Sequence, residues 1–450
     1  MQTLLDSFTK LQKIRALVIG DFMLDIYVKG DVERISPEAP VPILKVNSQE
    51  MRAGGAGNVI MNLLALDADV TALGRIGDDI EGAQIQQILQ DHAVDISYIY
   101  REEGYITPTK SRLIGNSQQL YRIDKEVNRM IRIDIEEKIL KILPSIMPSI
   151  DIILVSDYKK GAVSTSILKA TFALSEEYNI PVLVDPKGDD FTQYKGAYLI
   201  KPNLKEAYIA AHISTQAPID EVARILIEQS NVRYLLITRS EKGISLFEKD
   251  TQNRRDFSVC SKEVKDVTGA GDSVLAMLAV SIANHVAIDN AIQLANISGA
   301  LAIERLGCVS ISLSNIAEYI LRQHQIEQRN KIAHGIPNQL DWNSEKDLEV
   351  IKKSLSGYQV IVVDSSERLA SFCFERFLSL KEKNEDKILV YIQGEQKDFD
   401  YLPGVYFLLH ELGFIVIGGN ASLDKLREIF GEENIYLLNN KGIETELIYQ

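Results

Sequence analysis

Cysteine is scarce in this sequence. The 450 residues include three cysteines, Cys260, Cys308 and Cys373, which lie far apart and do not have the spacing of a metal site. We therefore expect reduced thiols and a cytoplasmic protein. No apolar run approaches the length needed to cross a membrane. The first ten residues contain no basic leader followed by an apolar core, so we expect no secretory signal.

Positive charge is also in short supply. The formal net charge is −14, which argues against non-specific binding to nucleic acid but leaves a phosphorylated substrate open. No Gly-x-x-x-x-Gly-Lys-Ser/Thr motif is present, which excludes a P-loop enzyme. Hydrophobic residues make up 46% of the chain and charged residues 25%, the composition of a soluble globular protein. The length predicts one large domain and one smaller domain.

The most informative stretch is Asp266-Val-Thr-Gly-Ala-Gly-Asp-Ser273, which leads into an apolar segment of helix length, residues 274–280. A helix start offers unpaired amides and the positive end of the helix dipole, and glycine lets the backbone approach a ligand, so such a turn can hold a phosphate. Local physics supports two interpretations of Asp272 equally. It either caps a buried helix or accepts the proton of a hydroxyl that attacks a phosphoryl group.

This stretch resembles the C-terminal signature of the ribokinase-like carbohydrate kinases. The resemblance implies that the amides of Gly269, Ala270 and Gly271 form the anion hole for the transferred phosphoryl group and that Asp272 is the base. It covers residues from about 14 to 325. It implies an α/β fold, a ribokinase-like three-layer sandwich with a small β lid, and we expect this domain to occupy residues 1–325.

Two segments near the N-terminus predict contacts with a sugar. The strand expected at residues 15–20 is followed by Asp21 and Asp25, at the end where open α/β sheets bind ligands. These aspartates either accept sugar hydroxyls or serve as turn and cap residues. Gly54-Gly55-Ala-Gly-Asn58 is a second glycine-rich turn before an apolar helix. Asn58 is a poor base but can bind hydroxyls, so we expect a substrate site there.

The second glycine turn resembles the N-terminal signature of the same family, which continues to Asp78 and Asp79. We interpret these two aspartates as caps of the next helix. Residues 27–46 alternate apolar residues with prolines, as exposed or edge strands do. In the family such a lid covers the sugar and often forms the dimer, so we expect a homodimer through the lid. Residues 34–44 resemble the lid of bacterial heptose 7-phosphate kinases, the kinase half of the bifunctional ADP-heptose enzymes.

Residues 107–124 predict further lid strands. They carry the best-placed cations for a sugar phosphate, although a row of charges on a strand can also be a solvated face. These cations are Lys110, Arg112 and Arg122.

From residue 150 the sequence alternates strands and helices, which predicts a parallel sheet with polar strand ends at one edge. By resemblance to the heptose kinases, Asp157 and Lys187 belong to the substrate site. Asn203 and Glu206 resemble the Asn-x-x-Glu element that holds Mg²⁺ through water near the nucleotide phosphates. The resemblance assigns further residues to ATP: Thr238, Ser240, Gly243, Thr268 and Asn296, with residues 306–308 beside the adenine.

Residues 326–343 are expected to form a linker, and residues 344–450 a smaller Rossmann-like α/β domain. In the bifunctional heptose enzymes this position holds a nucleotidyltransferase with a His-x-Gly-His motif after its first strand. Here Asp364 is followed by Ser-Ser-Glu-Arg, without histidine. We therefore expect a degenerate nucleotidyltransferase that does not transfer AMP to heptose 1-phosphate, with a structural or partner-binding role instead.

The expected function is ATP-dependent phosphorylation of the anomeric hydroxyl of D-glycero-β-D-manno-heptose 7-phosphate to the 1,7-bisphosphate. Mg²⁺ is the expected cofactor, and the resemblance also allows a monovalent cation. Positioning and charge stabilisation suffice for such a transfer. A kinase for another sugar or sugar phosphate remains an alternative, as does a pseudokinase that only binds these ligands. The retained Asp272 disfavours the pseudokinase. No nucleic-acid or membrane partner is expected.

Overall fold

The structure is a computed structural model. It describes residues 2–116, 118–251, 253–259, 264–305, 307–320 and 322–323, and in the C-terminal part residues 359–364, 388–393, 415–419, 422–430, 435–439 and 442–444. The chain divides into two compact units, residues 2–320 and residues 321–450 together with Met1. The expected linker, residues 326–343, lies outside the described residues.

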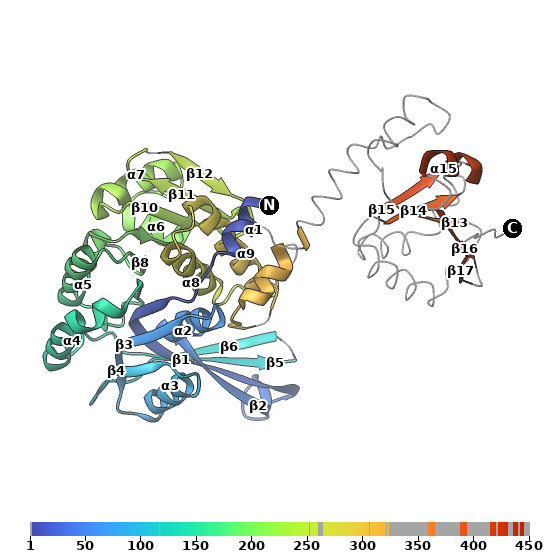
Figure 1. Ribbon diagram of the computed structural model, residues 1–450. Helices are drawn as coiled ribbons and strands as arrows, with labels where there is room; N and C mark the ends of the chain where they lie inside the picture. Colours follow the sequence, from blue (N-terminus) through green and yellow to red (C-terminus); the bar gives the residue numbers. More distant parts are fainter. Residues whose placement is uncertain are drawn as a thin grey trace. The chain divides into compact units, whose positions relative to one another are not determined.

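A mixed central sheet forms the middle of the unit 2–320 (Figure 1), in the strand order β12-β11-β10-β9-β8-β7-β1-β3-β4. Neighbouring strands from β10 to β4 are parallel, whereas β11 and β12 are antiparallel. Parallel strands buried on both faces need continuous apolar runs, which the sequence supplies. The strands are β1 (Arg15–Ile35), β3 (Asp69–Gly77), β4 (Asp95–Glu102), β7 (Ile152–Ser156), β8 (Val182–Asp185), β9 (Leu199–Ile200), β10 (Tyr234–Thr238), β11 (Ile244–Glu248) and β12 (Arg254–Phe257).

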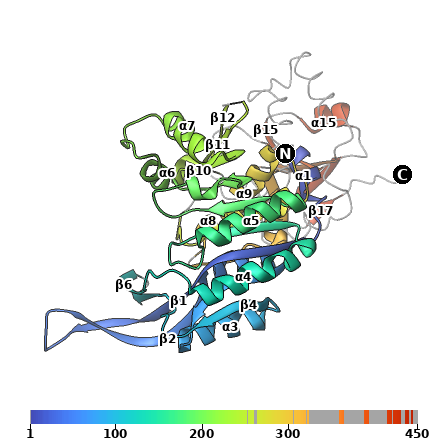
Figure 2. The ribbon, with the colours of Figure 1, turned by 90° about the vertical axis from the view of Figure 1, so that its left-hand side faces the viewer.

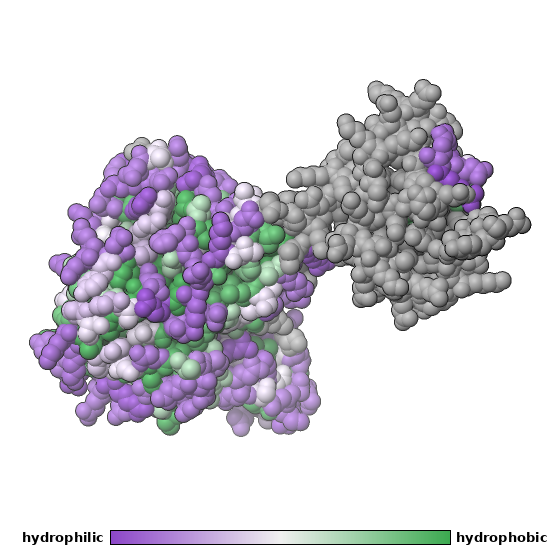
Figure 3. Space-filling model, in the orientation of Figure 1, coloured by the Kyte–Doolittle hydropathy of each residue, from purple (hydrophilic) through white to green (hydrophobic). Residues whose placement is uncertain are grey.

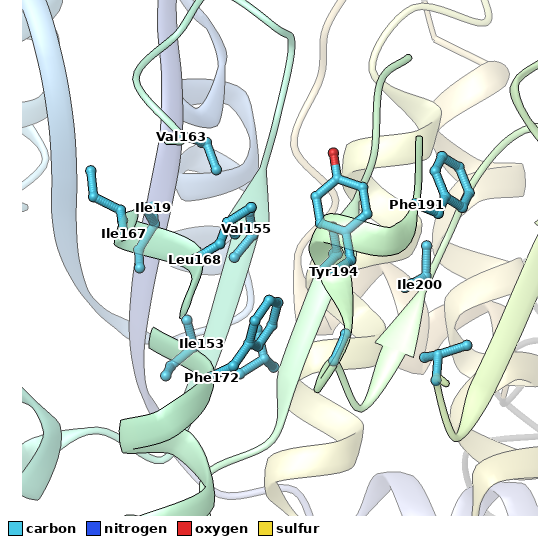
Figure 4. Packing of buried hydrophobic residues seen from close by; sticks show 14 of the residues in the cluster. Ile19, Ile153, Val155, Val163, Ile167, Leu168, Phe172, Phe191, Tyr194 and Ile200 are labelled. Atoms are coloured by element: carbon cyan, nitrogen blue, oxygen red, sulfur yellow. The ribbon is translucent and has the colours of Figure 1, made fainter. Parts of the chain in front are cut away.

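Helices cover both faces of this sheet, so the unit has three layers (Figures 1 and 2). Alternate strand residues such as Ile153 and Val155 pack with α4, α5, α6 and α7 in the cluster of Figure 4. On the other face α8 lies against α2 and α9, and its residues 272–282 are all buried. The helices are α1 (Gln2–Phe8), α2 (Ala56–Ala65), α3 (Ile80–Asp91), α4 (Ile133–Ile146), α5 (Thr165–Tyr178), α6 (Leu204–Ala211), α7 (Ile219–Ser230), α8 (Ala270–Ala283), α9 (Ile288–Ile303) and the 3₁₀ turns η1 (Met147–Ser149), η2 (Thr192–Tyr194) and η3 (Ser240–Lys242).

Strand β1 corrects one prediction from the sequence. It does not end at Gly20 but continues to Ile35. Its residues up to Asp21 pair with β3, and those from Phe22 onward pair with β2. The backbone groups beyond Gly20 are therefore satisfied by a new strand partner, and no turn is needed there.

The second half of β1 belongs to a smaller sheet, which we call the lid sheet. Its strand order is β2, residues 22–35 of β1, β5 and β6. Figure 2 shows β1 and β2 projecting from the helical body. Ile35, Val46, Tyr121 and Ile123 are large apolar residues left exposed on this sheet. The remaining strands are β2 (Pro42–Gly55), β5 (Thr109–Gly115) and β6 (Gln118–Lys125).

The unit 321–450 contains a second sheet in the order β15-β14-β13-β16-β17. All pairs are parallel except β16 with β17. Parallel pairing is what the expected alternation of strands and helices predicts. The described elements are β13 (Gln359–Asp364), β14 (Ile388–Gln393), β15 (Ile415–Gly419), α15 (Leu423–Phe430), β16 (Ile435–Asn439) and β17 (Gly442–Glu444).

Hydrophilic residues cover most of the described surface in the view of Figure 3. Among the described residues, no helix combines the length and apolarity that a bilayer crossing requires.

A buried arginine anchors the loop that follows β7. Arg75, at the end of β3, is 1% exposed, and its Nη1 pairs with Glu102 Oε2 at 2.6 Å. Its guanidinium also donates to the carbonyls of Arg129 and of Lys160, the latter at 2.8 Å. The guanidinium lies 3.9 Å from the centre of the Tyr105 ring. One side chain thus links β3, β4 and two loops.

We predict that Arg75→Met lowers the free energy of unfolding by about 3–5 kcal/mol, because the buried Glu102 carboxylate loses its buried partner and, among the described residues, keeps only Arg129, whose side chain is 44% exposed. Arg101→Met is the matched control, because Arg101 is half exposed and pairs with Asp78 at 3.6 Å. It should cost less than about 1 kcal/mol. Urea unfolding of the full chain, with hydrogen exchange of β3 and β4 peptides, measures both. Equal effects of the two variants would contradict the prediction.

Candidate active site

The polar strand ends meet at the carboxyl edge of the central sheet. Strand β1 lies between β7 and β3. From β1 the strands follow in chain order on both sides, as β7 to β10 on one side and as β3 and β4 on the other. Open α/β sheets bind ligands at such a point. Asp157, Asp185 and Lys201 each end or directly follow one of the neighbouring strands. All three side chains are largely buried.

A glycine turn, residues 269–271, begins helix α8 at this edge. Gly269 is the N-cap residue and has φ 79°, a conformation that favours glycine. A Cβ atom on Gly269 would lie 2.8 Å from Asn58 Nδ2 and 3.3 Å from Cys308 Sγ. Among the described residues the amide of Gly271 has no backbone partner, and that of Ala270 makes only a long 3.4 Å bond to Val267. The turn therefore offers amide groups to an anion.

Asp272 lies in the first turn of α8 and does not cap the helix, because Gly269 occupies the N-cap position without a side-chain bond. The capping interpretation is therefore wrong. The Asp272 carboxylate is 6% exposed, accepts a 2.5 Å hydrogen bond from Asn58 Nδ2 and lies 3.5 Å from the Tyr158 hydroxyl. Desolvation, together with the charge of Asp185, raises the pKa of Asp272 to about 6, against the opposing effects of Asn58 and two lysines.

Helices α2 and α8 are joined by two side-chain bonds. Asn58 binds Asp272. Asn62, one turn further along α2, accepts a 2.7 Å bond at Oδ1 from Oγ of Ser273, the residue after Asp272. Asn62 in turn donates to the carbonyl of Asn58 at 2.9 Å. The sequence analysis expected Asn58 to face the sugar and missed Asn62 and Ser273. The spacing of two asparagines four residues apart, which places them on one helix face, was the available signal.

Two lysines stand beside the glycine turn. Lys201 Nζ pairs with Asp185 Oδ1 at 3.1 Å, and both side chains are largely buried. The same Nζ lies 3.4 Å from where a Cβ on Gly271 would be. Lys187 pairs with Glu206; its desolvation lowers its pKa, but the bond to Glu206 outweighs this and raises it. Sequence analysis named Lys187 but missed Asp185 and Lys201, although both are polar residues at strand ends.

Asn203 and Glu206 form a capping box at the start of α6. Asn203 Oδ1 accepts from the amide of Glu206 at 2.9 Å, and Glu206 Oε2 accepts from the amide of Asn203 at 2.9 Å. Within the described part of the chain, no cluster of three or more His, Cys, Asp or Glu side chains could hold a metal ion directly. Glu206 Oε1 also pairs with Lys187, but the amide oxygen of Asn203 and both oxygens of Glu206 each keep a further lone pair, so the two residues fit a hydrated Mg²⁺ bound through its waters.

Asp21 orders a loop. Its carboxylate accepts from the amides of Tyr158, Lys160 and Ala162 at 2.9, 3.0 and 3.0 Å. These bonds show that Asp21 orders the loop after β7, and its binding of sugar hydroxyls stays a prediction. The loop presents Tyr158, which sequence analysis did not assign to the site. Lys110 and Lys187 place their Nζ atoms 5.4 and 5.6 Å from the centre of its ring.

Asp25 faces the lid sheet. Its Oδ1 accepts from Arg112 Nη1 at 2.6 Å, and the Arg112 guanidinium lies 5.1 Å from the Tyr27 ring centre. A Cβ on Gly54 would lie 2.4 Å from Asp25 Oδ2, so only glycine fits beside this carboxylate. Gly55 directly precedes α2 and has φ 58°. The structure thus groups Asp25, Gly54 and Arg112, three of the residues expected to bind the sugar, and their binding role stays a prediction.

Two residues expected at the substrate site have partners of their own within the protein. Asp157 accepts a 2.7 Å bond from Tyr194, whose ring belongs to the core of Figure 4. Desolvation raises the pKa of Asp157 to about 6. Arg122 lies on β6, is half exposed and pairs with Asp124 at 2.9 Å. Asp157 thus holds Tyr194 of the core, and Arg122 lies on the solvent-exposed face of its strand.

The residues expected to contact the nucleotide have the following local partners in the structure. Thr268 donates through its amide and hydroxyl to Asp266 at 2.9 and 2.7 Å. Asn296 is buried in α9 and donates to the carbonyl of Ser258 at 2.5 Å. Thr238 forms a bridge with Asn203. Ser240 and Gly243 belong to or directly follow η3. Leu306, and Ser365 to Arg368 after the first strand of the smaller unit, lie outside the described residues.

Comparison with solved structures shows the fold. Ribokinase from Arabidopsis thaliana, complexed with ribose and ATP, matches with a TM-score of 0.53 at 18% identity, over 68% of this chain and 98% of that chain. Phosphofructokinase-2 from Escherichia coli, in complex with potassium, matches with a TM-score of 0.56 at 17% identity, over 68% and 97% of the two chains. The fold is therefore ribokinase-like, as the sequence predicted.

Curated relatives match a similar share of the chain. The bifunctional protein HldE of Geotalea uraniireducens (strain Rf4) is 40% identical over 319 residues, which are 70% of this chain and 65% of the relative. The protein of the same name from Campylobacter curvus (strain 525.92) is 38% identical over 323 residues, 71% of this chain and 68% of the relative. The matched region thus spans about two thirds of these relatives. The family model for pfkB family carbohydrate kinases matches residues 13–315. With that match and these relatives, the chain belongs to the pfkB family of carbohydrate kinases, phosphotransferases with an alcohol group as acceptor.

Proposed function

We propose that the chain transfers the γ-phosphoryl group of ATP to the anomeric hydroxyl of D-glycero-β-D-manno-heptose 7-phosphate. The observation that carries this proposal is the buried Asp272 carboxylate in the first turn of α8, directly after the glycine turn. The resemblance of residues 34–44 to the lid of heptose 7-phosphate kinases supports the choice of sugar. The proposal concerns the unit 2–320 only.

In this mechanism Asp272 takes the proton of the attacking hydroxyl. Asn58, on α2, and Tyr158, in the loop after β7, each approach one of its two oxygens, which fixes the direction of the carboxylate. The amides of the glycine turn and Lys201 receive the negative charge of the transferred group. Asn203 and Glu206 would hold Mg²⁺ through water, and the bound cation neutralises charge on the nucleotide phosphates. A requirement for a monovalent cation stays a prediction.

Lys110 is our candidate for the distal phosphate of the sugar. Arg112 pairs with Asp25 and Arg122 pairs with Asp124, whereas Lys110 has no ion pair among the described residues. Desolvation lowers its pKa, with partial compensation from nearby carboxylates such as Asp25. A partly buried cation without a salt-bridge partner is stabilised by an anionic ligand. Lys110 comes from the lid sheet and lies beside Tyr158, which places it between the lid and the base.

We predict that Asp272→Asn lowers kcat roughly 10²–10⁴-fold in a folded protein, the range for loss of a general base. The base must be ionised, so wild-type kcat/KM should fall as the pH drops through about 6. Steady-state kinetics from pH 5 to pH 8 (about three units around that value) checks both statements.

Asp157→Asn is the matched control, because the Asp157 carboxyl is also buried and its pKa is also raised to about 6. This variant should keep the acid limb of the pH profile. Loss of the limb in Asp157→Asn, or an unchanged kcat in Asp272→Asn, would contradict the assignment of Asp272 as the base.

We predict that Lys110→Met raises KM for the sugar phosphate roughly 10-fold or more, since a hydrogen bond to a charged group contributes about 1.5–3 kcal/mol. The same variant should change little with the unphosphorylated heptose, which lacks the distal phosphate. Arg122→Met is the control and should behave like wild type with both sugars. A panel of phosphosugars assayed for ADP release with wild type identifies the sugar. Equal losses on phosphorylated and unphosphorylated heptose would remove Lys110 from the phosphate site.

We also infer a homodimer through the lid sheet, as the sequence predicted for residues 27–46. Val46 is 56% exposed and Ile123 is 56% exposed, on the edge strands β2 and β6. Exposed edge strands with apolar residues need a partner. Light scattering should show a dimer at micromolar concentration and a monomer for Val46→Asp. Ile133→Asp, on α4 and 72% exposed, should remain dimeric. A monomeric wild type would contradict the inference.

A further inference from the structure

A two-residue turn connects the lid sheet with the glycine turn. Gly307 and Cys308 come after α9 in the chain. They contact β1 and β2 of the lid sheet on one side and residues 266–269 on the other. The resemblance to carbohydrate kinases implies only a place beside the adenine for this turn.

The contacts on the lid side come from Arg52 and Tyr27. Arg52, near the end of β2, donates from Nη1 to the carbonyl of Cys308 at 2.6 Å. Tyr27, on β1, lies with its hydroxyl 3.6 Å from Cys308 Sγ. The Arg52 guanidinium lies 5.2 Å from the Tyr27 ring centre, and its Nη2 pairs with Glu50 at 3.1 Å. Arg52 is therefore held in place on the lid sheet by a ring and a carboxylate.

The contacts on the site side reach the glycine turn. The amide of Gly307 donates to Asp266 Oδ2 at 2.9 Å, and the other oxygen of Asp266 accepts from Thr268. These bonds outweigh the desolvation of Asp266 and lower its pKa, so the carboxylate is a stable anchor. Cys308 Sγ lies 3.3 Å from where a Cβ on Gly269 would begin. The turn therefore packs directly against the first residue of the glycine turn.

We propose that Arg52 is a positioning residue that ties the lid sheet to the glycine turn through the carbonyl of Cys308. This inference rests on the proposed kinase function. Phosphoryl transfer depends mainly on holding the acceptor hydroxyl and the transferred group in line and on excluding water. The acceptor lies under the lid sheet and the transferred group at the glycine turn. A fixed link between the two aligns them. The sequence does not reveal this link, because Arg52 and Cys308 are 256 residues apart.

Lys29 provides a matched control. It stands on β1 of the lid sheet and pairs with the same carboxylate as Arg52, Glu50, at 2.6 Å. Its side chain is 43% exposed. Among the described residues it has no bond to residues 307–308. Lys29→Gln therefore removes a lid cation and one Glu50 bond, as Arg52→Gln does, but leaves the link to Cys308 in place.

The first test needs no activity. Hydrogen exchange of the full chain is followed in peptides that cover β2 and residues 264–272, for wild type, Arg52→Gln and Lys29→Gln. We expect Arg52→Gln to speed exchange in both peptides by roughly 10-fold, the factor for one lost hydrogen bond to a charged group. Lys29→Gln should affect β2 alone. Unchanged exchange at residues 264–272 in Arg52→Gln, or equal effects of both variants there, overturns the proposal.

The second test measures coupling of ATP use to the sugar. Arg52→Gln should lower kcat for sugar phosphorylation roughly 10-fold and raise the share of ATP hydrolysed without sugar, with Lys29→Gln like wild type. Arg52→Lys should restore part of kcat, because the ammonium can still reach the carbonyl but lacks the second donor direction. A loss in Arg52→Gln confined to KM for ATP overturns the proposal. A wild type inactive on every sugar phosphate refutes the proposed function, while the exchange test still decides the link.

Discussion

The hydrogen bond from Asn58 to Asp272 is the interaction on which the rest of the site depends. A buried carboxylate is costly unless it is hydrogen-bonded and compensated by charge. Here the side-chain amide of Asn58, on α2, binds it directly. The bond between Ser273 and Asn62, which lies one turn further along α2, joins the same two helices. The two glycine-rich turns that begin α2 and α8 are thereby held side by side. The base and the glycine turn can then act on one bound group.

The lysines near the glycine turn obey the same constraint. Lys201 is held by Asp185 and Lys187 by Glu206. Each positive charge is thus kept at a fixed place in a desolvated region at a lower cost than an isolated charge would have. The Glu206 carboxylate has two roles. It forms the capping box with Asn203 at the start of α6, and it also binds Lys187. Structural and chemical roles therefore share residues, and a sequence motif alone does not separate them.

Strand β1 explains why the sugar side was harder to predict than the phosphoryl side. Gly20-Asp21 has the composition of a turn, yet the strand passes through it, because β3 and β7 pair with its first half and β2 and β5 with its second. Asp21 binds three backbone amides of the loop that Arg75 also holds, a structural role that the local sequence did not reveal. Local propensity favoured a turn, and long-range strand pairing decided otherwise.

The family, the ribokinase-like fold, the parallel strands and the glycine turn before a buried helix could be predicted from the sequence, because these depend on residues close together in the chain. The partner of each polar side chain could not be predicted, because it depends on contacts between distant parts of the folded chain. Asn58 and Asp272 are 214 residues apart, and Arg52 and Cys308 are 256 apart. Such pairs form only when the sheet has brought distant turns to one edge, because a buried charge is stable only where partners are within reach.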